Sequence, residues 1–223
     1  MATLLAMRNI SKSFSGVSVL QDVCFDLEPG EVHVLAGENG AGKTTFIKIL
    51  AGVHTDYEGE IELCGRKVRF TSPHDAAGKG ISAIHQEMSL VGTLTVIDNI
   101  FLGKELTTRH SAGLLIDRAR QLAKAKDLCG LLGLEIDLER PVDDYALSVK
   151  NRIEIAKALA LDARILLMDE PTSALNAPEV DTLFQVVSEL KRRGTAIVYI
   201  THRMEEIYRI GDRITVLYSA QIN

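Results

Sequence analysis

Short apolar runs alternate along the chain with longer stretches in which apolar residues recur every three or four positions. Apolar runs bounded by glycine or polar residues are typical of buried strands, and the three-to-four spacing predicts amphipathic helices. The predicted strands are residues 31–37, 80–87, 164–170, 195–202 and 212–218. The predicted helices between them are residues 41–52, 178–194 and 203–211. Strands that alternate with helices indicate an α/β fold with a mostly parallel sheet and helices on both faces.

Two further segments interrupt this alternation. Residues 59–70 alternate in polarity around Gly65, which predicts an antiparallel hairpin. Residues 95–138 carry few strand signals and include the helical stretch "DRARQLAKAKDLCGLLGL". The sequence therefore predicts a helical insertion between the second and third strands of the main sheet.

Composition and charge narrow the class of protein. The chain has 223 residues, of which 46% are hydrophobic and 25% charged, as in a globular protein with a substantial core. A net charge of −5 argues against a nucleic-acid partner, because such binding needs a basic surface. Cys24, Cys64 and Cys129 are far apart, so neither a zinc site nor a disulfide framework is predicted, and a reducing cytosol fits best. We find no apolar run long enough to span a membrane and no secretory signal.

A glycine-rich segment carries the clearest chemical signal. "GENGAGKT" matches the pattern G-x-x-x-x-G-K-[ST], and it follows a predicted strand and opens a predicted helix. Successive backbone N–H groups of such a loop surround phosphates, Lys43 should reach the β- and γ-phosphates of a nucleotide, and the Thr44 hydroxyl should coordinate Mg²⁺. The alternative is a glycine-rich turn without a ligand, which this context disfavours. The predicted nucleotide-binding residues of the loop are Gly37, Glu38, Asn39, Gly40, Ala41, Gly42, Lys43, Thr44 and Thr45.

Polar residues at the ends of other predicted strands extend this picture. "ILLMDE" ends in Asp169, which should hold Mg²⁺ mostly through water, and Glu170, which is placed to act as general base on an attacking water. The alternative is a pair of surface acids. Gln86 and His202 also lie at strand ends; either alone is better explained as a hydrogen-bonded polar residue. A phosphate loop by itself fits kinases, GTPases and motor ATPases equally well.

Taken together, these motifs resemble those of the ATP-binding cassette (ABC) ATPases, and the likeness covers essentially the whole chain. The resemblance implies that Phe14 stacks on adenine and that His202 contacts the γ-phosphate. It implies that Gln86 ligates Mg²⁺, supports hydrolysis and senses a membrane partner. "SALN", residues 173–176, resembles the D-loop, which usually ends in aspartate, so Asn176 is a departure from the pattern.

The resemblance also implies a domain organisation. Residues 1–223 would form a single ABC ATPase cassette with a P-loop NTPase core and a mostly parallel sheet. Within it, residues 1–91 and 160–223 would form a RecA-like core with an antiparallel β subdomain at its edge. Residues 92–159 would form a helical subdomain that contains the signature region.

Longer sequence segments around these motifs, including "EIAKALALDARILLMDEPTSAL", are similar to those of monosaccharide-importer ATPases of the ribose, galactose and xylose type. Those chains usually carry two fused cassettes, and this one resembles the N-terminal cassette. The likeness implies ATP and Mg²⁺ as cofactors. It implies a transmembrane permease and a second, head-to-tail cassette as partners, and a periplasmic sugar-binding protein as an indirect one. The expected location is cytoplasmic, peripheral at the inner membrane.

One motif departs from the family. In residues 147–158, "LSVKNRIEIAKA", Val149 and Lys150 stand where the family pattern LSxGQ has a glycine nearby. Ser148 remains, but Glu154 follows it by six residues, whereas the family has about eight. In the family this turn faces the γ-phosphate of the other cassette, so the alteration should affect the partner's site. Either the turn is crippled, or its helix N-terminus still points at that phosphate more weakly.

Three functional hypotheses follow. The first is a transport ATPase that energises sugar import. The second is a regulatory or degenerate cassette that binds nucleotide with little turnover, which the altered signature supports. The third, a soluble ABC ATPase of repair or translation, is disfavoured by the net negative charge and by the sequence similarity to sugar-importer ATPases.

Overall fold

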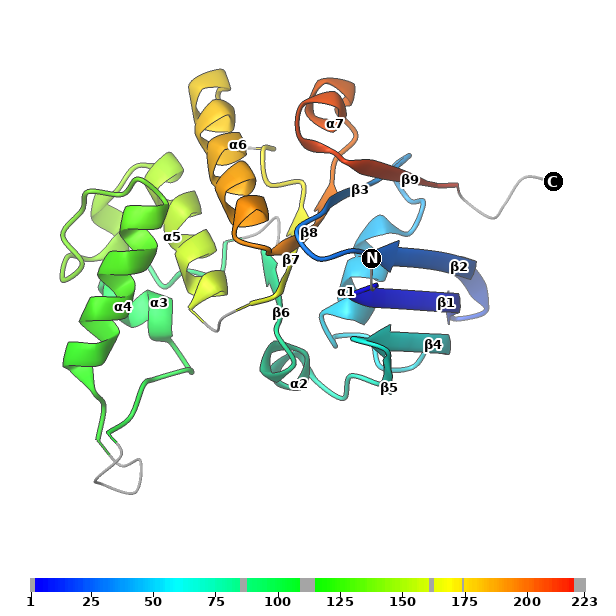
Figure 1. Cartoon of the computed structure of the whole chain (residues 1–223), viewed down its shortest axis with the longest axis horizontal. Helices are drawn as coiled ribbons and strands as arrows, with labels where there is room; N and C mark the ends of the chain where they lie inside the picture. Colours follow the sequence, from blue (N-terminus) through cyan, green and yellow to red (C-terminus); the bar gives the residue numbers. More distant parts are fainter. Residues whose placement is uncertain (1–2, 85–87, 109–114, 161–162, 174, 219–223) are drawn as a thin grey trace.

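A computed structural model describes residues 3–84, 88–108, 115–160, 163–173 and 175–218. Two sheets lie side by side, and a group of helices lies beyond the parallel sheet, on the side away from the antiparallel one (Figure 1). Among the helices of these described ranges, none has the length and apolar character needed to cross a membrane.

The larger sheet has five strands, all parallel to their neighbours, in the order β6-β7-β8-β3-β9. Its strands are β3 (Val32–Gly37), β6 (Ile81–Ile84), β7 (Ile165–Asp169), β8 (Ala196–Ile200) and β9 (Arg213–Leu217). All five lie within predicted strands, so the predicted parallel sheet is confirmed. Strands β7 and β8 are buried along their whole length, which explains why they are continuous apolar runs rather than alternating ones.

The second sheet is antiparallel, in the order β2-β1-β4-β5. Its strands are β1 (Leu5–Phe14), β2 (Val17–Leu27), β4 (Glu58–Leu63) and β5 (Arg66–Val68). Cys64 and Gly65 join the last two with φ of 51° and 73°, the left-handed conformations that a tight hairpin requires, so the predicted hairpin is confirmed. The long β1–β2 hairpin was not predicted. Its pairing shifts register three times, which breaks the polar–apolar alternation that marks a strand in sequence.

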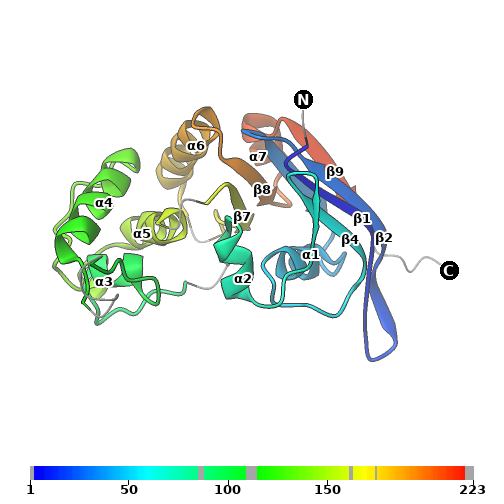
Figure 2. The same ribbon diagram turned by 60° about the horizontal axis from the view of Figure 1, so that its bottom comes forward.

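Helices α1 (Lys43–Leu50), α2 (Pro73–Gly78), α6 (Ala177–Arg192) and α7 (Met204–Ile210) accompany the parallel sheet. Helix α1 packs between the two sheets, in one core cluster with Leu167 and Val198 (Figure 2). Their sequence neighbours, Leu166 on β7 and Tyr199 on β8, belong to a second core cluster that includes the apolar side of α6. Alternate residues of one strand thus serve two cores, and both faces of the sheet are covered.

The segment between β6 and β7 is helical. It contains α3 (Val96–Phe101), α4 (Arg118–Leu131), a 3₁₀ turn (Val142–Asp144) and α5 (Leu147–Leu159). The predicted helical insertion is therefore confirmed. These helices share the α6-side core cluster, so the insertion packs against the sheet rather than standing apart.

Candidate functional site

The glycine-rich loop leaves the end of β3 and turns directly into α1. Gly42 precedes the helix with φ 95°, and a side-chain carbon there would lie 2.6 Å from the Leu20 Cδ2 atom and 2.8 Å from the Val19 carbonyl oxygen. Gly37 is crowded in the same way, because a Cβ would lie 2.4 Å from the Leu217 carbonyl oxygen. Only glycine fits both positions, so the strands around the loop hold its backbone in a tight curve.

Lys43 is buried, and its side chain folds back over the loop. Its Nζ donates hydrogen bonds to the carbonyl oxygens of Gly37 at 2.7 Å and Glu38 at 2.9 Å. The ammonium is therefore held within the curve of the loop, where an anionic ligand would compete with the two carbonyls for it. The next residue, Thr44, is exposed on the first turn of α1, and Thr45 is half-buried.

Acidic residues and a histidine meet at the ends of β7 and β8. Asp169 ends β7 and is buried, and Glu170 follows it with φ 48°, a left-handed conformation that costs a non-glycine residue about 1–3 kcal/mol. The Glu170 N–H donates to the Ile200 carbonyl oxygen at 3.1 Å, which ties the two strand ends together. The Glu170 Oε1 atom lies 3.0 Å from Nδ1 of His202. The structure thus brings these two predicted residues into direct contact.

Strand register places this pair beside the loop. Ile200 of β8 is opposite both Leu35 of β3 and Asp169 of β7, so the carboxyl ends of these three neighbouring strands share one edge of the sheet. Ligands of open parallel sheets bind outside that edge. The loop after β3, the acids after β7 and the histidine after β8 therefore face the same region.

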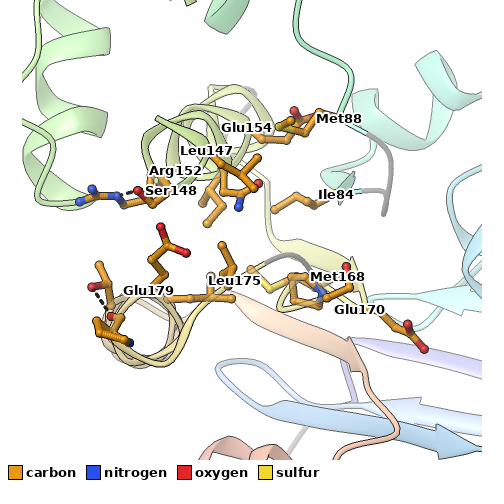
Figure 3. Close-up of a pocket in the computed structure, with 17 residues that line it drawn as sticks. Ile84, Met88, Leu147, Ser148, Arg152, Glu154, Met168, Glu170, Leu175 and Glu179 are labelled. Atoms are coloured by element: carbon orange, nitrogen blue, oxygen red, sulfur yellow. Dashed lines mark hydrogen bonds between the residues drawn. The ribbon is translucent and has the colours of Figure 1, made fainter. Parts of the chain in front are cut away.

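A cavity of about 340 Å³ adjoins this region, between α5, α6 and the end of β7. Its walls are largely apolar, and they include Met168 and Leu175. Ser148 and Arg152 of α5 lie across the cavity from α6, whereas the Glu170 carboxylate lies at the cavity's edge and points away from α5 (Figure 3). Glu170 and the signature serine thus border one cavity without touching.

The signature turn is an ordinary first turn of a helix. Helix α5 begins at Leu147 after Ala146, which offers no side-chain cap, and the N–H groups of Val149 and Lys150 bond back to the Ala146 carbonyl. The Lys150 ammonium pairs with the Asp143 carboxylate at 3.1 Å. Its charge is therefore directed to this chain's own carboxylate.

The predicted adenine-stacking residue lies on the antiparallel sheet. Phe14 ends β1 with 39% of its surface exposed. The buried Lys12 ammonium lies 4.6 Å from the centre of its ring, and the ring of His54 lies edge-on at 5.2 Å. One side of the ring is therefore supported by this chain while part of it stays open. Gln86, which is predicted to ligate Mg²⁺ and support hydrolysis, lies outside the described residues.

Asn176, the departure from the D-loop pattern, has a clear structural role. It caps α6 in a reciprocal box: its side chain accepts from the Glu179 N–H at 3.1 Å, and the Glu179 carboxylate accepts from the Asn176 N–H at 3.0 Å. Asparagine and aspartate are comparable helix caps, so the change preserves the start of the helix.

With this geometry in place, comparison with known proteins decides the family. The family model described as ABC transporter matches residues 20–173, more than half of the chain. The chain belongs to the ABC transporter family. The match begins in β2 of this ABC cassette and ends just after the Glu170 turn, so it includes the glycine-rich loop and the helical insertion.

The cassette is similar along nearly its whole length to named importer subunits. "Ribose import ATP-binding protein RbsA" of Hahella chejuensis is 48% identical over 217 residues, which are 97% of this chain and 43% of that protein. "Ribose import ATP-binding protein RbsA 2" of Streptomyces avermitilis is 48% identical over 97% of this chain and 42% of its own length. The chain therefore spans about two fifths of the length of these relatives.

Solved structures support the fold. A crystal structure of the ADP conformation of an ATP-binding cassette of an ABC transporter superposes with a TM-score of 0.85, at 24% identity, over 100% of this chain and 90% of that one. A nucleotide-free ATP-binding cassette gives a TM-score of 0.82 at 22% identity, over 97% and 88% of the two chains.

Sequence reasoning overlooked one buried carboxylate near the site of the cassette. Glu206 of α7 is 4% exposed and accepts a hydrogen bond from Thr172, two residues after Glu170. The neighbouring Glu205 is exposed, and two adjacent glutamates in a helix are usually interpreted as part of its solvent-exposed face. The available signal was helical spacing, because Glu206 lies four residues before Ile210 and beside the buried Ile207.

Proposed function

We propose that this cassette binds MgATP on the Gly37–Thr45 loop and hydrolyses it with Glu170 as general base. The observation that carries the proposal is the contact between Glu170 and His202 at the sheet edge that the loop also borders. A carboxylate held by a histidine at that edge is placed to accept a proton from an attacking water. His202 would then orient Glu170 and contact the γ-phosphate, while Phe14 would stack on adenine.

The residues present fit Mg²⁺. Magnesium prefers oxygen ligands and is usually held by one or two carboxylates together with substrate phosphates. The Thr44 hydroxyl and the Asp169 carboxylate supply such oxygens, and Gln86 is the third proposed ligand. Within the described ranges, no group of three or more His, Cys, Asp or Glu residues could hold a metal alone.

We further propose that hydrolysis energises the import of a sugar. The support is the likeness, along 97% of this chain, to proteins named for ribose import. The partners would be a transmembrane permease, a second cassette in head-to-tail arrangement that receives Ser148 at its nucleotide, and indirectly a periplasmic sugar-binding protein. The cassette would then lie on the cytoplasmic side of the inner membrane, with residues 92–159 as its helical subdomain against a core of 1–91 and 160–223.

Hydrolysis of MgATP by the purified chain tests the assignment of the base. Glu170→Gln keeps the shape of the side chain and removes its basicity, so the rate should fall by about 10²- to 10⁴-fold. The matched control is Glu205→Gln, which changes an exposed acid of α7. Equal rates in all three proteins would refute the role of Glu170.

A second candidate function is a regulatory cassette with little turnover in the paired site. The observation that favours it is the Lys150–Asp143 ion pair in a signature turn that lacks its glycine. Rebuilding the turn as "LSVGQQNRIEIAKA" restores both the glycine and the spacing. With a catalytically intact second cassette, the rebuilt chain should hydrolyse ATP faster if the natural turn is deficient. An unchanged rate would favour the transport ATPase with a functional turn.

A further inference from the structure

Glu206 is the centre of a buried hydrogen-bond cluster behind the proposed catalytic pair. Its Oε1 atom accepts from the Thr172 hydroxyl at 2.6 Å, and its Oε2 atom accepts from the Tyr199 hydroxyl at 3.1 Å. The Arg203 guanidinium lies 3.5 Å from Oε1. Thr172, Tyr199 and Glu206 are all buried, so solvent has little access to the hydrogen bonds between them.

Both oxygens of the Glu206 carboxyl group accept a hydrogen bond from a hydroxyl. Burial raises the pKa of the Tyr199 phenol far above its usual range, so its hydroxyl keeps its proton and can donate. The Thr172 hydroxyl also donates, and the Arg203 guanidinium lies nearby. Removing one of these donors would leave a buried acceptor unsatisfied.

The bonded groups belong to the two segments that carry the catalytic pair. Thr172 follows Glu170 by two residues, and Glu206 follows His202 by four. The Glu170–His202 contact and the Thr172–Glu206 bond therefore cross between the same two segments, one on the exposed side and one on the buried side. Tyr199, on β8, fixes Glu206 to the strand from which His202 emerges.

We infer that Glu206 is a positioning residue for ATP hydrolysis, which holds the His202 segment at the distance from Glu170 that their contact requires. His202 needs such support because its own side chain is 57% exposed and its Nδ1 atom contacts the carboxylate of the proposed base. A misplacement of about 1 Å from a change outside the reacting atoms costs about 10²-fold in rate. The inference rests on the proposed roles of Glu170 and His202.

The test compares Glu206→Gln and Thr172→Val with the parent chain and with the exposed-site control Glu205→Gln. Thr172→Val keeps the volume of the side chain and removes only the hydroxyl donor. Both variants should lower kcat for MgATP hydrolysis by about 10- to 100-fold. Their KM and their calorimetric Kd for MgATP should stay within about threefold of the parent values, because the nucleotide loop is untouched. A general loss of structure would instead weaken nucleotide binding.

A double-mutant comparison separates positioning from mere stability. If Glu206 acts through the histidine, adding Glu206→Gln to His202→Ala should lower kcat little further. The inference is overturned if folded Glu206→Gln and Thr172→Val both turn over ATP at the parent rate. It is also overturned if the losses from Glu206→Gln and His202→Ala multiply. Failure of the proposed function is distinct, because then Glu170→Gln itself would leave turnover unchanged.

Discussion

Replacing Lys43 by methionine should weaken MgATP binding while leaving the fold intact. The substitution keeps an unbranched side chain of similar length and removes the ammonium, which in the structure bonds the carbonyl oxygens of Gly37 and Glu38. A hydrogen bond to a charged group contributes about 1.5–3 kcal/mol, which corresponds to about 10- to 150-fold in Kd. The ammonium must give up its two carbonyl bonds to reach a phosphate, so we expect the lower end, about 10-fold.

Isothermal titration calorimetry with MgATP measures this directly. Lys48→Met is the matched control, because it removes a lysine from the same helix, five residues after Lys43 and outside the loop. Its Kd should equal that of the parent. The assignment of the glycine-rich loop as the nucleotide site is refuted if Lys43→Met binds MgATP as tightly as Lys48→Met does.

Three further predictions concern buried groups outside the loop. Burial lowers the pKa of His33 in the folded chain below its unfolded value of 6.5. As the pH drops below 6.5, the imidazole therefore takes up a proton more readily in the unfolded chain, and the free energy of unfolding should fall. In urea melts at several pH values, His33→Gln should reduce that fall. Burial raises the pKa of Cys129 to about 11, so a thiol reagent at pH 7.5 should modify the two exposed cysteines of the native chain and reach Cys129 only after denaturation. Lys12→Met should cost about 0.5–2 kcal/mol of unfolding free energy in the same melts, because the ammonium loses its cation–π contact with Phe14 and its ion pair and hydrogen bond with Asp56. Unchanged stability would contradict a stabilising role for these contacts.

The sequence predicted the parallel sheet well because four of its five strands, all but the edge strand β9, are largely buried. Such strands are continuous apolar runs, and the glycine-rich loop adds a pattern that fits few other structures. The β1–β2 hairpin was missed because Asn9 and Asp22 adopt left-handed conformations near its register shifts, so apolar residues do not alternate there. Periodicity alone cannot report such a break.

Site residues could be predicted from the sequence only where a chemically suitable side chain directly follows a predicted strand. Glu170 and His202 each follow an apolar run, so the sequence places both at one sheet edge; their contact depends on register, which the structure supplies. Glu206 was missed because a buried carboxylate and an exposed one look alike in sequence. Its burial is accompanied by two hydroxyl donors, Tyr199 on β8 and Thr172 in the segment after β7, which helical spacing does not reveal. The pairing of Lys150 with Asp143 likewise depends on a turn that the pattern did not predict.

The most direct test of the catalytic assignment measures binding and chemistry on one protein, Glu170→Gln. MgATP affinity is measured by calorimetry, and the first turnover is followed by rapid quench with the chain in excess over labelled ATP. The assignment predicts a Kd within about threefold of the parent, because Lys43 and its loop are unchanged, and a first turnover slowed by about 10²- to 10⁴-fold. A first turnover at the parent rate with ATP fully bound would contradict it, since hydrolysis would then proceed without the Glu170 carboxylate.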